Sequence, residues 1–237
     1  MDTPSPFRFD YHPGTIRFGA GTVDTLAEEL TTQGIDSALV CCGESVGATP
    51  EVRDPVEAGL GDRHAGTFAG TSARKTLSEA AAARDRFRET DADAFLALGG
   101  GSALDVAKAA AVLTASEQSL SDAARALADT GTIPIPDGDL PPLLAVPTTL
   151  AGADLSQMAG ITAGPESGAL DERVADALDE ALALPIRLWY GPPLVVPTPP
   201  RLPAAPATNR LHHAPETPLA ADAAPRTGPA ADAPPPP

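Results

Sequence analysis

The chain contains little lysine and little cysteine. Among its 237 residues only Lys75 and Lys108 are lysines, and only Cys41 and Cys42 are cysteines. Adjacent cysteines in an apolar segment are badly placed for a disulfide and give no metal-ligand spacing, so we expect both to be small core residues. No run of about 18 apolar residues occurs, and the N-terminus lacks the basic and apolar regions of a signal peptide. The sequence therefore predicts a soluble, cytoplasmic protein without a membrane partner.

Basic residues in general are scarce. Lysine and arginine total 16 against 32 aspartates and glutamates, which gives a formal net charge of −16. Because phosphate groups are bound by clustered lysine and arginine, this balance argues against nucleic acid and anionic membranes as partners. An acidic excess in which arginine replaces lysine is expected of a halophilic protein working in concentrated salt, although an ordinary acidic protein fits the same composition.

Proline is concentrated in the last part of the chain. Sixteen of the 27 prolines follow residue 184. Because a proline inside a helix costs about 3 kcal/mol, we expect mostly irregular structure from Pro185 onward. Residues 220–237 are a low-complexity alanine and proline tail, which we expect to be disordered. These changes in composition predict three parts, residues 7–184, 185–219 and 220–237.

The first part alternates strand patterns with helix patterns. The predicted strands cover residues 15–18, 37–42, 64–70, 94–98 and 140–147, and the predicted helices cover residues 23–34, 75–92 and a segment from residue 102. We expect the second helix to be capped near Thr71 or Ser72. Such alternation predicts an α/β fold with a parallel sheet covered on both faces, and ligands of such sheets lie at the carboxyl ends of the strands.

A glycine-rich turn follows the predicted strand at residues 94–98. Gly99, Gly100 and Gly101 allow a tight turn, and Ser102 then opens a helix in which Ser102 and Asp105 could form a capping box. The free N–H groups at the start of a helix favour an anion, and pyrophosphate is a common ligand of such turns. A purely structural turn between strand and helix is the alternative interpretation.

Two familiar phosphate-binding patterns are absent from this turn. Neither GxxxxGK[ST] nor GxGxxG follows the strand, which excludes a P-loop and the usual dinucleotide fingerprint. The strand at residues 140–147 brings Thr148 and Thr149 to the same edge of the sheet. Their hydroxyls could bind phosphate or ribose, and a threonine pair that caps its own turn fits equally well.

Two motifs together resemble one enzyme family. GGGSALDVAKA at residues 99–109 and PTTLAGADLS at residues 147–156, with FGAGTVDTLAEEL at residues 18–30, resemble the iron-containing alcohol dehydrogenases, which include glycerol dehydrogenases and maleylacetate reductases. The resemblance covers roughly residues 7–220. It implies a parallel, Rossmann-like dinucleotide-binding domain, a C-terminal helical domain and hydride transfer in the cleft between them.

The resemblance also implies where a nicotinamide cofactor binds. Its expected site residues are Gly99, Gly100, Gly101, Ser102, Asp105, Thr148 and Thr149. The glycine turn and Ser102 would contact the pyrophosphate, Asp105 would lie near the ribose and nicotinamide, and the threonines would line the opposite side. The short spacing to Asp154 is similar to that of the maleylacetate reductases.

The choice between NAD and NADP stays open at this point. NAD-preferring members of the family carry an acidic residue after the second strand, whereas this chain has Gly43 there with Glu44 beside it. Arg74 and Lys75 could bind the 2′-phosphate of NADP. A solvated flank of the following helix is the alternative role of this basic pair.

The last part of the chain retains traces of the family's helical domain. ATNRLHHAPE at residues 207–216 resembles its first metal-binding helix, so that His213 matches a metal ligand and Asn209 replaces the ligand aspartate. Maleylacetate reductases also tend to have asparagine there, and the family pattern implies that they work without the metal. The chain ends before the family's other two histidine ligands, so we expect no complete iron or zinc site, and His212 and His213 point to different faces of a helix.

The resemblance implies an NAD(P)-dependent oxidoreductase that transfers a hydride between nicotinamide and an alcohol or carbonyl substrate. His213 is the expected catalytic residue, since it could stabilise charge on the substrate oxygen. The alternative is a catalytically inactive nucleotide-binding remnant, because the helical part is shortened and rich in proline. Dehydroquinate synthase shares the architecture, but its basic phosphate-binding residues are not evident. A small-molecule substrate and a homodimer are further expectations, since the family tends to form dimers.

Overall fold

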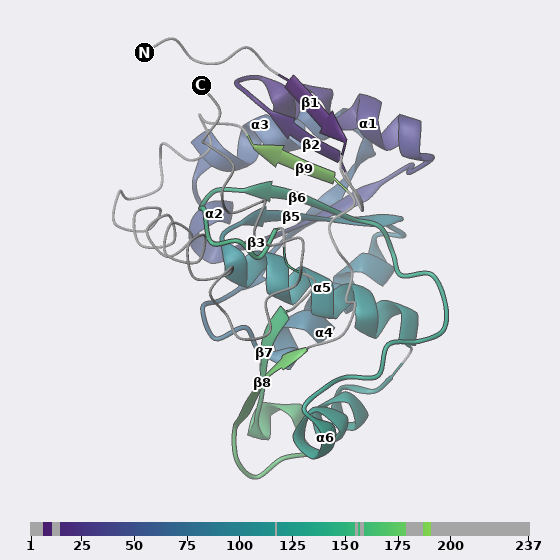
Figure 1. Cartoon of the computed structure of the whole chain (residues 1–237), viewed down its shortest axis with the longest axis vertical. Coiled ribbons are helices and arrows are strands. Elements are labelled where there is room, and N and C mark those ends of the chain that lie inside the picture. Colours follow the sequence, from purple (N-terminus) through teal and green to yellow (C-terminus); the bar gives the residue numbers. More distant parts are fainter. Residues whose placement is uncertain are drawn as a thin grey trace, which may run out of the picture.

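The computed structural model describes residues 7–10, 15–116, 118–154, 156, 159–178 and 187–190. These residues form one large sheet, helices on both of its faces and a smaller two-stranded sheet (Figure 1). Within these ranges, every helix is too short or too polar to cross a membrane. The predicted α/β fold class is confirmed.

The large sheet has seven strands in the order β1-β2-β9-β6-β5-β3-β4. The strands are β1 (Phe7–Asp10), β2 (Thr15–Phe18), β3 (Ala38–Gly43), β4 (His64–Thr71), β5 (Ala94–Gly99), β6 (Leu143–Pro147) and β9 (Arg187–Tyr190). Only β1 pairs antiparallel, with β2, and the other neighbours are parallel. The carboxyl ends of β3, β4, β5 and β6 therefore meet at one edge.

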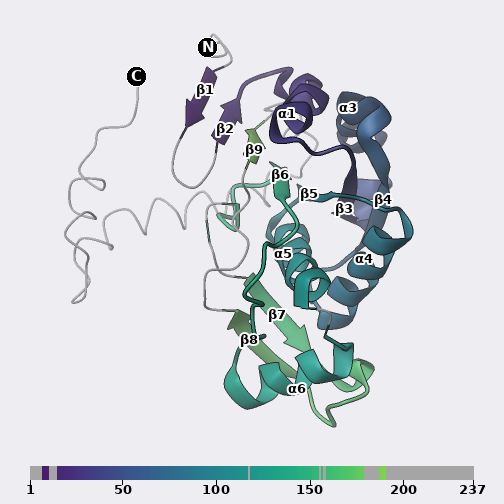
Figure 2. The ribbon, with the colours of Figure 1, turned by 90° about the vertical axis from the view of Figure 1, so that its right-hand side faces the viewer.

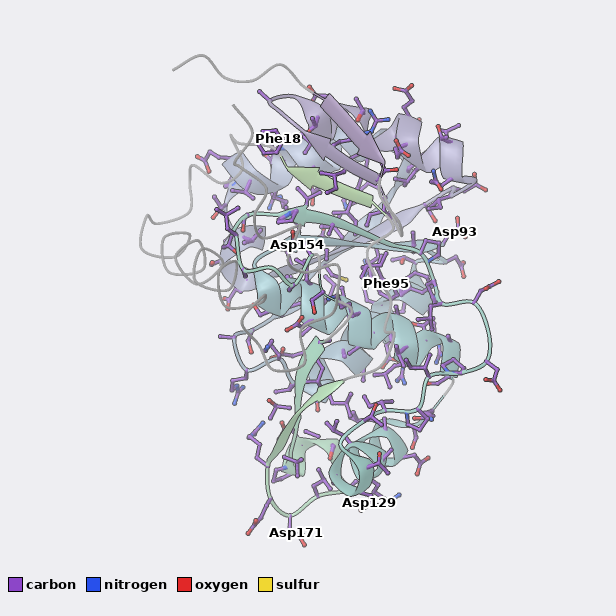
Figure 3. The ribbon with its side chains drawn as sticks, viewed as in Figure 1. Phe18, Asp93, Phe95, Asp129, Asp154 and Asp171 are labelled. Carbon is purple, nitrogen blue, oxygen red and sulfur yellow. The ribbon has the colours of Figure 1, made fainter. Side chains whose placement is uncertain are left out.

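Helices cover both faces of this sheet. The helices are η1 (Thr22–Thr25), α1 (Leu26–Gln33), α2 (Glu44–Gly47), α3 (Pro50–Leu60), η2 (Gly61–Arg63), α4 (Leu77–Glu89), α5 (Gly101–Ser116), α6 (Leu120–Thr130) and η3 (Pro165–Ser167). Side chains of β5 alternate between two separate cores, so that Leu96 packs with α1 and α3 whereas Phe95 packs with α4 and α5. The ring of Phe95 (Figure 3) stacks on that of Phe87, with centroids 4.3 Å apart.

Helix α5 lies between two layers. One side packs on the large sheet, and the other packs on β7 (Ala159–Ala163), which pairs antiparallel with β8 (Val174–Leu178) (Figure 2). Every residue from Ala103 to Leu113 is buried, including Asp105 and Lys108. A helix covered on both sides is expected to be mostly apolar, and apart from Asp105 and Lys108 these buried residues are alanine, leucine and valine.

The structure differs from the sequence-based description in three places. Helix α4 is capped by Thr76, whose side chain forms a capping box with Glu79, and strand β4 runs on to Thr71. The β7–β8 pair was not predicted. Arg187–Tyr190 forms a strand between β2 and β6, although we expected irregular structure there. The proposed division of the chain at residues 184 and 219 stays a prediction.

The adjacent cysteines have the role that the sequence predicts. Cys41 and Cys42 are fully buried on opposite faces of β3, one in each core. Burial raises the pKa of Cys41 far above its ordinary value, and burial, reinforced by the Glu57 charge, raises that of Cys42 to about 11. Both thiols therefore stay protonated and unreactive at neutral pH.

A glycine in α3 sets how closely this helix packs on η1. A Cβ atom on Gly59 would lie 2.2 Å from the carbonyl oxygen of Val23, a backbone atom that cannot rotate away. Helix propensity alone makes alanine better than glycine by about 1 kcal/mol. We predict the opposite sign: Gly59→Ala lowers the free energy of unfolding by about 1–3 kcal/mol in a urea titration.

Gly138→Ala is the matched control, because nothing lies within 4 Å of its added Cβ and Gly138 is exposed. This control should change the free energy of unfolding by less than about 0.5 kcal/mol. A stabilising effect of Gly59→Ala would contradict the close packing of α3 on η1.

Candidate functional site

A cavity of about 640 Å³ opens at the carboxyl edge of the large sheet. Loops that follow β3, β4, β5 and β6 form its walls. The residues that line it are Gly43, Glu44, Ser45, Val46, Thr49, Val52, Thr71, Ser72, Ala73, Gly99, Gly100, Ser102, Ala103, Thr148 and Thr149. Ligands of parallel α/β sheets bind at this edge, and the volume is within the range of small-molecule and cofactor sites.

The turn between β5 and α5 brings a helix N-terminus to this cavity. Gly99 has a φ of 141°, which favours glycine, and its carbonyl oxygen accepts a hydrogen bond from the Thr148 backbone N–H at 3.0 Å. The Gly100 carbonyl accepts from Ala103 and Leu104. Gly101 and Ser102 precede these donors, so their N–H groups have no acceptor within the helix. The positive end of the α5 dipole and the N–H group of Ser102, which lines the cavity, favour an anion there.

Close packing restricts the side chain at Gly100, whereas an added Cβ atom at Gly101 would make an ordinary contact. A Cβ atom on Gly100 would lie 3.3 Å from Oγ1 of Thr149, and one on Gly101 would lie 3.4 Å from the Cβ atom of Ala151. Gly101 therefore faces the loop after β6 and does not line the cavity. Small residues on both sides let this loop approach the start of α5 closely.

The capping box predicted for Ser102 and Asp105 does not form. The Oδ2 atom of Asp105 instead accepts hydrogen bonds from Lys75 Nζ at 2.9 Å and from the backbone N–H of Gly160 at 3.3 Å. The Asp105 carboxylate lies outside the cavity lining and is nearly buried. Of the seven expected cofactor residues, the cavity brings together five, and Gly101 and Asp105 lie behind its wall.

The same contact changes the expectation for the basic pair. Because Lys75 pairs with Asp105, its ammonium is directed toward α5 and β7 and is not available to a cofactor phosphate. Arg74 is exposed and does not line the cavity. Among the described residues, Glu44 is the only charged one in the lining, and sequence reasoning singled out the neighbouring Gly43 position instead.

Lys108 is fully buried one turn along α5 from Asp105. Its Nζ donates hydrogen bonds to the carbonyl oxygens of Ala153 at 2.6 Å and Ser156 at 2.7 Å. Burial lowers the pKa of Lys108 to about 8, and the charges of Asp105 and Asp154 counteract this shift only in part. These two hydrogen bonds attach the loop between β6 and β7 to helix α5.

The part of the chain that the structure describes offers no metal site. No group of three or more histidine, cysteine, aspartate or glutamate side chains lies together in the described ranges. His213, Asn209 and His212 lie outside the described residues, so the expected catalytic role of His213 stays a prediction.

The fold and the cavity define an α/β protein with a candidate ligand site at the carboxyl edge of a parallel sheet. The family model of the iron-containing alcohol dehydrogenases matches residues 13–176, which is more than half of the chain. The chain therefore belongs to the iron-containing alcohol dehydrogenase family, as the motifs predicted.

Several relatives are maleylacetate reductases. The chain is 30% identical to that of Sphingobium indicum over 211 residues, 89% of this chain and 49% of the relative. It is 29% identical to maleylacetate reductase 1 of Cupriavidus pinatubonensis over 220 residues, 91% of this chain and 51% of the relative. The structure of maleylacetate reductase from Rhizobium sp. strain MTP-10005 superposes with a TM-score of 0.70 at 25% identity, over 96% of this chain and 55% of that one. The chain thus spans about half the length of the relatives it matches.

The buried ammonium of Lys108 predicts a pH dependence of stability. Its pKa is about 8 in the folded protein and 10.5 ordinarily, so between these values the unfolded chain binds more protons. The free-energy penalty for burying the charged ammonium is complete at pH values below the pKa of Lys108 in the folded protein. It decreases as the pH rises from that value toward the pKa in the unfolded chain. Relative to Lys108→Met, the wild type should therefore gain up to about 3 kcal/mol of unfolding free energy between roughly pH 7 and pH 10.

Urea titrations of both proteins at the two pH values measure this difference. Because the other titrating groups are common to both chains, their contributions cancel to first order. An equal pH response of the two proteins would show that Lys108 titrates at its ordinary pKa when folded.

Proposed function

We propose that this chain is the cofactor-binding part of an NADH-dependent reductase, with an unsaturated keto acid such as maleylacetate as the substrate. The observation that carries the proposal is the cavity in which the glycine turn, the N-terminus of α5 and the threonine pair meet. Family membership and the maleylacetate reductase relatives support the reaction class.

The cavity lining fits a dinucleotide in two respects. The Ser102 N–H group can donate to the pyrophosphate, and glycine at position 100 lets the phosphate approach the backbone. The hydroxyl groups of Thr148 and Thr149, across the turn, are suited to the adjoining phosphate or ribose. Since no cation lines the cavity among the described residues, these neutral donors must hold the phosphates.

The charge of the lining favours NADH over NADPH. The Glu44 carboxylate can accept hydrogen bonds from the ribose hydroxyls, whereas the same carboxylate repels a 2′-phosphate. Lys75, which could have neutralised that phosphate, pairs with Asp105.

The bound nicotinamide supplies the hydride, and the residues of this chain bind and orient it. The apolar parts of Val46, Val52 and Ala103 in the lining exclude water from one side of the cavity. A donor to the substrate oxygen is required as the hydride is transferred, and we assign this role to His213.

Fluorescence titration with NADH tests the binding step. We expect saturable binding by the wild type and an increase in Kd of about tenfold or more for Gly100→Ala, since the added methyl group lies between the turn and Thr149. Gly100 does not have a positive φ, so alanine is compatible with its backbone. Gly138→Ala should bind as the wild type does, and the absence of wild-type binding would contradict the proposal.

An absorbance assay of NADH oxidation with maleylacetate then tests turnover. Oxidation that depends on maleylacetate and falls at least about tenfold in His213→Ala supports the complete proposal. NADH binding without oxidation favours a nucleotide-binding chain that has no activity by itself. Equal turnover of the wild type and His213→Ala would remove His213 from the proposed mechanism.

A charge reversal tests the cofactor preference. We expect Glu44→Arg to weaken NADH binding and strengthen NADPH binding, so that the ratio of the two Kd values changes by about 100-fold. Glu51→Arg is the control, because Glu51 is an exposed acidic residue of α3 that does not line the cavity. Parallel shifts of both cofactors in Glu44→Arg, as in the control, would exclude a contact between Glu44 and the ribose.

A further inference from the structure

Both lysines of the chain belong to one group of charges, in which Asp105, Lys108 and Asp154 are buried and Lys75 is partly exposed. Arginine supplies fourteen of the sixteen basic residues, and the two exceptions are Lys75 and Lys108. Lys75 pairs with Asp105, and the charges of Asp105, Asp154 and Lys75 all act on Lys108. We call these four residues, Lys75, Asp105, Lys108 and Asp154, the lysine network. Its two positive and two negative charges balance.

The Lys75–Asp105 pair connects the cavity wall formed by the loop after β4 to helix α5. Asp105 Oδ2 accepts from Lys75 Nζ and from the N–H of Gly160 on β7. Lys75 also accepts a hydrogen bond at its carbonyl oxygen from the Thr162 N–H at 2.9 Å. The loop just before Lys75, residues 71–73, lines the cavity. One carboxylate therefore connects α5, the loop after β4 and strand β7.

Lys108 connects the cavity wall formed by the loop after β6 to the same helix. Lys108 follows Asp105 by three residues, which places both side chains on one face of α5. Its Nζ bonds two carbonyl oxygens in the loop that follows Thr148 and Thr149. Asp154 is buried in this loop and is labelled in Figure 3. The glycine turn at the start of α5 therefore lies between two loops, and side chains of α5 bond to both of them.

The geometry around Lys75 explains why arginine is absent here. A Cβ atom on Gly160 would lie 2.7 Å from Lys75 Nζ, so the ammonium fills the space that glycine leaves. A planar guanidinium is bulkier than an ammonium, so we expect it to fit this space less well. Lys75 also has a φ of 50°, a conformation that costs a non-glycine residue about 1 kcal/mol or more. Such a residue persists where surrounding contacts hold it.

We propose that Asp105 is a positioning residue of the nucleotide site, which acts through Lys75 and sets the separation of the cavity walls without contacting the cofactor. The inference rests on the proposed NADH binding. It differs from the role that the family resemblance implies for Asp105, which places this carboxylate beside the cofactor.

A double-mutant cycle on NADH binding tests the proposal. Asp105→Asn and Lys75→Met should each raise the Kd by about tenfold, and the double variant should raise it no further, because both changes break the same contact. Lys75→Arg keeps the charge and should not restore the Kd. Glu89→Gln is the control, since it removes one partner of the exposed Arg86–Glu89 pair, and it should leave the Kd unchanged.

Selective ¹³C labelling of lysine provides a second measurement on the wild-type protein. With two lysines in the chain, the NMR spectrum contains two sets of side-chain signals. NADH should shift the Lys75 signal although Lys75 does not line the cavity, and this response should disappear in Asp105→Asn. A purely structural salt bridge would lower the stability of the variants without this response.

The outcomes separate the inference from the proposed function. If the wild type binds NADH but the single variants bind equally well, the positioning role is wrong and the proposed function stands. A raised Kd in Asp105→Asn alone, with Lys75→Met unaffected, would make Asp105 a direct ligand and also overturn the inference. If a variant does not fold, the wild-type spectrum still tests the proposal. A Lys75 signal that does not shift at saturating NADH would contradict it. Failure of the wild type to bind would overturn the proposed function itself.

Discussion

The burial of α5 between the large sheet and the β7–β8 pair is the constraint on which the site depends. An alanine-rich helix can lie close to the strands on one side and to β7 on the other, since its side chains are short. This packing fixes the N-terminus of α5 at the carboxyl edge of β5, where the glycine turn faces the cavity. It also buries Asp105 and Lys108, whose charges must then be satisfied by Lys75 and by backbone carbonyl groups.

The electrostatics of the cavity follow from the same arrangement. A protein with a net charge of −16 repels an anionic ligand at long range, and salt screens this repulsion. Neither lysine reaches the lining, so attraction at short range must come from N–H groups at the start of α5 and from hydroxyl groups. The scarcity of lysine is a property of composition, whereas the partly exposed Lys75 is a compact cation that packs next to Gly160.

The sequence predicted the parts of the fold that depend on local patterns. Buried strands such as Ala94–Gly99 can be recognised in the sequence as apolar runs. The glycine turn and the threonine pair predicted the position of the cavity. The contacts made by Asp105 could not be predicted in this way. A serine three residues before an aspartate at a helix start is a normal capping signal, but the buried carboxylate gains more from the Lys75 ammonium, which lies thirty residues away in the sequence. We did not predict the strand Arg187–Tyr190, because the many prolines around it indicate irregular structure. The four residues of the strand themselves contain no proline.

In the proposed site, the start of α5 holds the phosphates of a nucleotide. This contact can be tested in the ¹⁵N NMR spectrum of the protein, with amide signals of Gly100, Gly101 and Ser102 followed during titration with ADP and, separately, with adenosine. We predict large shifts of these three signals with ADP and small ones with adenosine, because only ADP carries the pyrophosphate that the turn would bind. Equal responses to both ligands, or shifts confined to residues remote from the turn, would contradict it.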